Sequence, residues 1–133
     1  MATFGAFLTG REVAKHMIKR KSGTIIFTGA TASLRGGDGY SAFSSAKQAK
    51  RSLAQSMARE LGPQGIHVAH VVIDGAIDTP WIKELFTDFY NEKKDLDGLM
   101  NPNDIANNYL WLHKQPRNAW THEIDLRPWI EKW

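Results

Sequence analysis

Lys47 is the residue of this 133-residue chain whose surroundings point most clearly to chemistry. It follows Phe43 by four positions in a segment with helical spacing, so both side chains project into the same space about one turn apart. An ammonium group beside an apolar surface can lower the pKa of a neighbouring acid and bind the hydroxyls of a ligand. A structural lysine would instead lay its stem on the core and keep its charged end in water. Composition alone favours the structural interpretation, because long charged side chains rarely stay buried without a partner.

The segments on either side of Lys47 are typical of an open α/β sheet. Residues 24–28 are a continuous run of β-branched and aromatic side chains, which predicts a strand covered on both faces of a parallel sheet. A glycine-rich loop follows, then a long amphipathic helix over residues 40–62, and residues 66–73 predict a second buried strand. Ligands of such sheets bind where a buried strand leads into a loop and a helix. This order of elements therefore indicates a ligand site around Lys47.

Three blocks of the sequence resemble the second half of a short-chain dehydrogenase/reductase: GTIIFTGATASLRGGDGYSAFSSAKQA, MARELGPQGIHV and IDGAIDTP. In that family a strand ends in a catalytic Ser, the next helix carries Tyr-x-x-x-Lys, and the following strand ends in Pro-Gly-x-x-x-Thr. The resemblance implies that Lys47 is the retained catalytic Lys, with Phe43 at the Tyr position and Ala30 at the Ser position. Neither replacement has a hydroxyl proton to exchange, as in the subgroup of the family with Phe in place of the Tyr. Tyr40 offers another hydroxyl in the same loop.

The resemblance also implies a cofactor, NAD or NADP, with Lys47 binding its ribose. Asp74, Gly75 and Thr79 stand where the family's Pro-Gly-x-x-x-Thr turn runs beside the nicotinamide; Gly75 and Thr79 match the motif, and Asp74 replaces the Pro. A carboxylate at Asp74 would repel a phosphate but could accept a hydrogen bond from a carboxamide. In relatives, residues 80–100 form the substrate lid, whereas their composition fits a surface helix and a solvated loop equally well.

The expected fold is α/β: a partial Rossmann-like, doubly wound fold with a three-stranded, mostly parallel sheet and helices on both faces. Residues 1–133 are expected to form a single domain, with further helices over residues 4–20 and 101–116 and a last strand over residues 119–126. The resemblance covers only the C-terminal half of the family fold, and the dinucleotide-binding N-terminal half has no counterpart. An open sheet edge exposes apolar surface. We therefore expect either that the chain associates with a copy of itself or with another polypeptide, or that it is a piece of a longer protein.

Composition and residue spacing limit the locations, metals and binding partners that we expect for this chain. The absence of cysteine favours a cytoplasmic location, no apolar run has the length of a membrane span, and no His and carboxylate set has the spacing of a metal site. The net charge is +3, and much of the basic excess lies at the C-terminal end of the first helix. The helix dipole favours cations at that end, so nucleic-acid binding is the weakest alternative. The resemblance implies a homo-oligomer through helices 4–20 and 40–62.

Two hypotheses of function follow. In the first, the chain is an NAD(P)-dependent oxidoreductase of this family with a degenerate catalytic site, in which Lys47 holds the ribose while Gly75 and Thr79 lie near the nicotinamide. In the second, it is a non-catalytic relative that kept the scaffold for dimerisation or ligand binding. Whether the chain is an enzyme depends on a hydroxyl near the missing Tyr, because general acid–base catalysis contributes about 10² to 10⁴ in rate.

Overall fold

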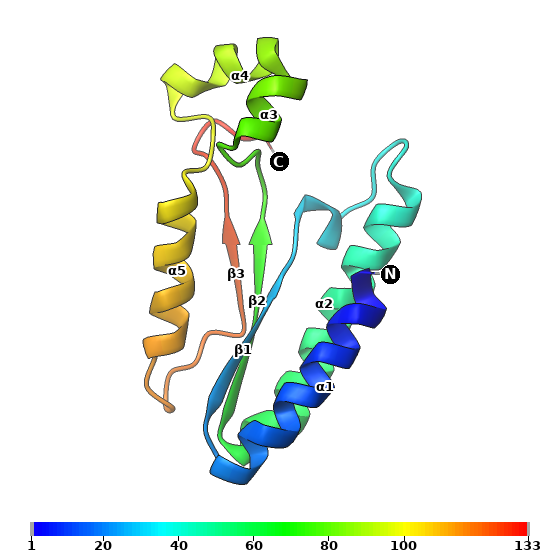
Figure 1. Ribbon diagram of the computed structural model, residues 1–133, viewed down its shortest axis with the longest axis vertical. Helices are drawn as coiled ribbons and strands as arrows, with labels where there is room; N and C mark the ends of the chain where they lie inside the picture. The colour runs from blue at the N-terminus through cyan, green and yellow to red at the C-terminus, as the bar shows by residue number, and fades with distance from the viewer. Residues whose placement is uncertain (1, 133) are drawn as a thin grey trace.

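The computed structural model describes residues 2–132, which form a three-layered α/β unit (Figure 1). The strands β1 (Gly23–Thr28), β2 (Ile66–Ile73) and β3 (Glu123–Leu126) lie in that order in one sheet, and both strand pairs are parallel. Helices α1 (Ala2–Arg20) and α2 (Ser41–Leu61) lie on one face and α5 (Pro102–Lys114) on the other. The expected α/β architecture with helices on both faces is confirmed, and the sheet is entirely parallel.

Two apolar clusters hold these layers together, one on each face of β2. Every residue of β2 is buried, which explains why all of its residues except His67 and His70 are apolar. Because successive side chains of a strand point to opposite faces, Ile66 and Val68 pack with α1 and α2, while Ala69, Val71 and Ile73 pack toward Leu112 of α5. Both faces of the sheet are therefore anchored on the central strand.

The last strand is shorter than the 119–126 span expected from its alternating pattern. The ring of Trp120 stacks on His67, with ring centroids 4.9 Å apart. The backbone of Thr121 bonds to side chains, since its N–H donates to Gln115 Oε1 at 2.7 Å and its carbonyl oxygen lies 2.7 Å from His67 Nε2. These contacts replace strand pairing, so β3 begins at Glu123.

The connection from β2 to α5 lies above the carboxyl ends of the strands (Figure 1). It contains two short helices, α3 (Pro80–Leu85) and α4 (Thr87–Lys93), followed by the 3₁₀ turn Lys94–Leu96. Pairing of Ile77 with Met100 closes the base of this excursion. It therefore forms a small helical unit at the same end of the sheet as the glycine-rich loop.

The opposite end of the sheet has a tight turn that requires glycine. Gly65, between α2 and β2, has φ = 81°, a left-handed conformation that other residues rarely adopt. A Cβ at this position would lie 2.6 Å from the carbonyl oxygen of Lys21. Gly65 thus allows α2 to return directly into β2.

Candidate functional site

A cavity of about 410 Å³ lies at the carboxyl ends of β1 and β2 and contains the sequence-predicted Ala30, Phe43 and Gly75. Ala30 follows β1, Phe43 lies in the first turn of α2, and Gly75 follows β2. The remaining lining residues belong mainly to the loop between β1 and α2: Thr31, Ala32, Arg35, Gly36, Gly37, Tyr40 and Ile73. The cavity thus brings together residues from the first and the third of the sequence blocks.

Lys47 is half-buried one turn along α2 from Phe43, and its Nζ lies 5.4 Å from the centroid of the Phe43 ring. Among the described residues, no carboxylate pairs with this ammonium group. Burial lowers the pKa of Lys47, and the neighbouring charge of Lys50 lowers it further. Lys47 therefore offers hydrogen-bond donors that no described carboxylate occupies, beside the cavity.

Asp74 lies behind the cavity rather than in its lining, with only 1% of its surface exposed. The Thr31 hydroxyl donates a hydrogen bond to Asp74 Oδ1. Arg35 Nη2 lies 3.7 Å from Oδ1, and Arg127 Nη2 lies 3.7 Å from Oδ2. Arg127 also pairs with Asp125. The carboxylate in the place of the family's Pro thus joins the loop after β1 to the segment after β3.

Arg35 is a site residue that the sequence patterns did not single out. It is the single charged residue in the cavity lining, and its side chain remains 39% exposed. A charged side chain directly before Gly36 and Gly37, in a loop that follows a buried strand, is the signal that could have found it. The cavity therefore has one cationic wall.

A partly buried polar network lies between α2 and the sheet. Arg51 donates two hydrogen bonds to Glu123, of 2.7 and 2.8 Å. His70 Nδ1 lies 2.9 Å from Glu123 Oε2, and His70 is fully buried. Burial lowers the pKa of His70 despite the opposing effect of Glu123, while the bond from Arg51 is the main cause of the lowered pKa of Glu123. His70 is thus a neutral ring that donates its Nδ1 proton to a carboxylate.

This network lies directly beneath the turn that carries Ala30. A Cβ on Gly29 would lie 2.4 Å from His70 Nε2 and 2.8 Å from Ser33 Oγ, so only glycine fits there. Ser33 Oγ accepts a hydrogen bond from the Ala30 N–H at 3.1 Å. The turn at Gly29 and Ala30 therefore packs closely against the side chains of His70 and Ser33.

Thr79 does not join the other predicted residues in this cavity. Its hydroxyl accepts a bond from the Ile82 N–H at 3.4 Å and caps α3. It lines a separate hollow with residues of α3 and α4. Of the predicted cofactor-binding residues, Gly75 lines the cavity, Lys47 lies beside it, Asp74 lies behind it and Thr79 begins the lid-like excursion.

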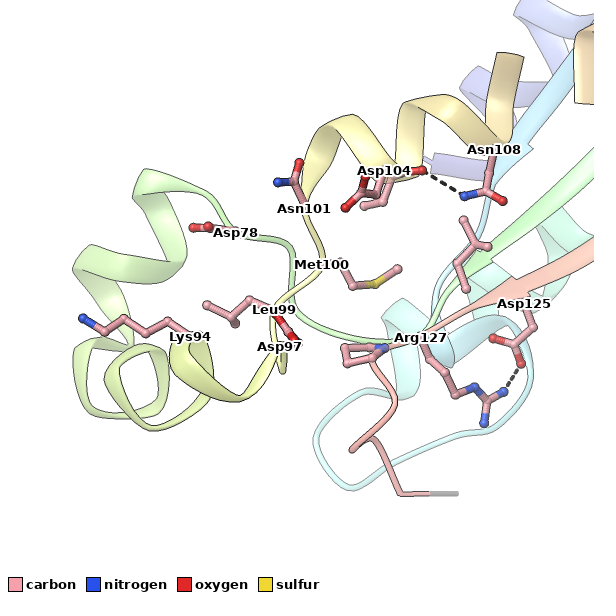
Figure 2. A pocket seen from close by; sticks show the side chains of 13 residues that line it. Asp78, Lys94, Asp97, Leu99, Met100, Asn101, Asp104, Asn108, Asp125 and Arg127 are labelled. Carbon is pink, nitrogen blue, oxygen red and sulfur yellow. Dashed lines mark hydrogen bonds and ion pairs between the residues drawn. The ribbon is translucent and has the colours of Figure 1, made fainter. Parts of the chain in front are cut away.

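A larger cavity, of about 610 Å³, lies on the α5 side of the same sheet end. Figure 2 shows Asp125, in β3, joined by a dashed line to Arg127, which lies just after that strand, and shows Asp104 and Asn108 on α5. None of the residues predicted from the sequence lines this cavity. Although several carboxylates are present, no group of three or more metal-binding side chains is found among residues 2–132.

No helix within the described part of the chain is both long and apolar enough to cross a membrane.

The sequence profile of the short chain dehydrogenase family matches residues 1–89. This chain belongs to the short-chain dehydrogenase family. It is 37% identical over 111 residues to the (2S)-[(R)-hydroxy(phenyl)methyl]succinyl-CoA dehydrogenase subunit BbsD of Thauera aromatica, covering 81% of this chain and 44% of that protein. The chain thus spans about half the length of the curated relatives that it matches.

Solved structures agree with this assignment. A short-chain dehydrogenase from Rhodopseudomonas palustris superposes with a TM-score of 0.74 at 44% identity, covering 97% of this chain and 49% of that one. A 7α-hydroxysteroid dehydrogenase in complex with NADH and a 7-oxo bile acid superposes with a TM-score of 0.82 at 26% identity, covering 97% of this chain and 52% of the other. These likenesses confirm the Rossmann-like fold of the family.

Proposed function

We propose that this chain forms the substrate-side half of an NAD(P)-dependent oxidoreductase that acts on an alcohol or carbonyl compound. The observation that carries the proposal is the convergence of Ala30, Phe43 and Gly75 on one cavity, with Lys47 beside it. A family member that is similar over nearly the whole chain carries NADH in its structure. The cavity is of a size that suits a small ligand.

The residues present fit a dinucleotide on this side of the site. The half-buried Lys47 ammonium has no described carboxylate partner, so its donors are available for ribose hydroxyls. Gly75 brings backbone without a side chain to the cavity wall. A bound nicotinamide would supply hydride exchange, and the chain's own task would be to orient the substrate and to exclude water.

Proton transfer in this site cannot use the family's Tyr and Ser hydroxyls. The hydroxyl-bearing residues that line the cavity are Thr31 and Tyr40. Thr31 already donates to Asp74, so its oxygen is oriented to accept a further hydrogen bond. The ring centroid of Tyr40 lies 6.2 Å from that of Phe43, which places a phenol at the rim of the cavity. If neither the Thr31 nor the Tyr40 hydroxyl reaches a bound substrate, the chain is the non-catalytic relative of the second hypothesis.

Calorimetric titration with NADH and NADPH tests the proposal, on a sample whose mass is fixed by light scattering. We expect saturable binding that Lys47→Ala weakens about ten- to hundredfold, because hydrogen bonds from a charged donor are lost. Lys19→Ala removes an exposed lysine at the end of α1 and should bind as the unaltered chain does. Absence of binding, or equal binding by Lys47→Ala, would contradict the proposed dinucleotide site.

We further propose a homo-oligomer through α1 and α2. Two features support it: small residues line an exposed stripe of α2 that another helix could approach closely (Ser45, Ala49, Ser52 and Ser56), and Phe4 and Phe7 of α1 are 64% and 42% exposed. The same light-scattering measurement tests this arrangement, and a monomeric mass would contradict it. The lack of cysteine fits a reducing compartment such as the cytoplasm.

A further inference from the structure

We infer that the cavity selects substrates that carry a carboxylate, and that Arg35 is the residue that binds it. This inference rests on the proposed function, because it names the substrate class of the same cavity: an oxo acid or a hydroxy acid. The group that reacts would lie toward Phe43 and Ala30, and the carboxylate would lie toward the guanidinium of Arg35.

The first support is the distribution of charge in the lining. Of the ten residues that form the cavity, Arg35 alone carries a charge. The other walls are methyl groups, aromatic rings, Ile73 and glycine backbone, with hydroxyls at Thr31 and Tyr40. No acidic side chain lines the cavity, so nothing in its wall competes for the guanidinium or repels an anion.

The second support is the loose pairing of Arg35 with its buried counter-ion. Its Nη2 lies 3.7 Å from Asp74 Oδ1, beyond hydrogen-bond distance, and that oxygen already accepts the Thr31 hydroxyl. Among the described residues, the Arg35 side chain makes no hydrogen bond. A guanidinium has five N–H donors in a planar fork that matches a carboxylate. Asp74 thus holds the charge of Arg35 near the cavity while leaving its donors available.

The third support is the contrast with the other arginine of this cluster. Arg127 pairs with both Asp74 and Asp125 and lies outside the cavity. The two arginines therefore divide the roles: Arg127 neutralises the buried carboxylate from behind, while Arg35 extends toward the ligand space. Asp74 is a positioning residue in this arrangement, and Arg35 is the residue that touches the substrate.

A comparison of acetoacetate with methyl acetoacetate tests the inference, because the two differ in charge and share the reacting carbonyl. Binding to the full chain is followed by NMR, through the backbone amides of Ala30, Phe43 and Gly75 and the side-chain Nε–H of Arg35. We expect the acid to bind about ten- to hundredfold more tightly than the ester, the range that charged hydrogen bonds give.

Arg35→Gln should abolish the preference for the acid, and Arg35→Lys should keep part of it, since lysine retains the charge without the fork. Arg59→Gln is the matched control, because Arg59 is an exposed arginine in the last turn of α2, at the opposite end of that helix from Phe43. It should leave the preference unchanged. The amide spectrum of each variant reports whether the fold is kept, and Arg35→Lys decides the matter if Arg35→Gln does not fold.

Equal binding of acid and ester, no binding of either, or a preference that survives Arg35→Gln would each overturn the inference. NADH titration of the same samples separates it from the proposed function. Loss of the acid preference in Arg35→Gln with NADH binding intact supports both. If the chain prefers the acid but binds no dinucleotide, the carboxylate site is supported and the proposed oxidoreductase function is contradicted. If it binds NADH without preferring the acid, the dinucleotide site is supported and the carboxylate site is contradicted.

Discussion

Two groups of ionisable side chains lie on the same face of the sheet and differ in how tightly they are bonded. In the middle of the sheet, Arg51, Glu123 and His70 are joined by hydrogen bonds of 2.7 to 2.9 Å. At its carboxyl end, the guanidinium groups of Arg35 and Arg127 lie 3.7 Å from Asp74. In the first group the Glu123 carboxylate is hydrogen-bonded to both of its partners, although no hydrogen bond among the described residues reaches His70 Nε2. The second group balances charge and leaves donors of Arg35 available.

This difference indicates that the two groups have separate roles, one in stability and the other in ligand binding. The partly buried Glu123 carboxylate bonds to both Arg51 and His70 and so fixes the relative positions of α2, β2 and β3, because its loss would leave the buried His70 Nδ1 unsatisfied. The carboxyl-end group lies where open α/β sheets bind ligands, and its loose geometry suits a site that exchanges partners. We therefore expect stability to depend on the central group and ligand preference on the other.

Glu123→Gln should give the larger loss of stability. The amide keeps the shape of the side chain but turns one acceptor into a donor, which faces a donor of either Arg51 or His70. We expect the free energy of unfolding in urea to fall by about 2 kcal/mol, the cost of leaving a buried polar group unsatisfied. Glu84→Gln, at an exposed position of α3, should change it by less than about 0.5 kcal/mol. A loss of similar size in both variants would remove the contrast between the groups.

The central group should also make stability depend on pH. The pKa of His70 is lowered in the folded chain, mainly by burial, with smaller contributions from the charges of Arg51 and His122 and an opposing one from Glu123. Below the ordinary value of 6.5, the unfolded chain therefore binds more protons than the folded one. The free energy of unfolding should fall as the pH drops through 6.5 toward the lowered folded value.

Glu123 extends the same trend to lower pH. Its lowered pKa contributes stability that is present above the ordinary value of 4.5 and is lost as the pH falls below it. Urea unfolding at a series of pH values between 7 and about 3 measures both parts. His70→Gln should flatten the part of the curve just below pH 6.5 and keep most of the part below 4.5, because Arg51 is the main cause of the lowered pKa of Glu123 and His70 a smaller one. If the free energy of unfolding changes with pH equally near pH 6 in the unaltered chain and in His70→Gln, then His70 does not titrate as described.

The fold could be predicted where the local pattern matched the tertiary environment. The mostly apolar run of residues 66–73 predicted β2 with its observed bounds, because the strand is buried on both faces. The alternation of residues 119–126 overstated β3, because side chains of Gln115 and His67 bond the Thr121 backbone. Sequence periodicity could not reveal these bonds, which depend on elements that meet only in the folded chain.

Contacts in the site could be predicted between residues close in sequence, but not between residues from different elements. The proximity of Phe43 and Lys47 follows from helical spacing and is found in the structure. The approach of Arg35 to Asp74, and of Arg51 to Glu123, joins residues from different elements across the sheet. No motif encodes these pairs, so the cationic wall of the cavity and the buried network appeared only with the structure.

Asp74→Asn should cost less than the equivalent change at Glu123, although Asp74 is the more deeply buried carboxylate. The amide oxygen can keep the bond from Thr31, and no hydrogen bond among the described residues reaches Asp74 Oδ2. Loss of attraction to the two arginines is offset by the lower cost of burying a neutral group. We expect a change of no more than about 1 kcal/mol in urea unfolding, with Asp38→Asn in the exposed loop as the matched control. A loss as large as that of Glu123→Gln would mean that the carboxyl-end group also holds the fold together, and Arg35 would then be bound to its counter-ion too firmly to serve a ligand.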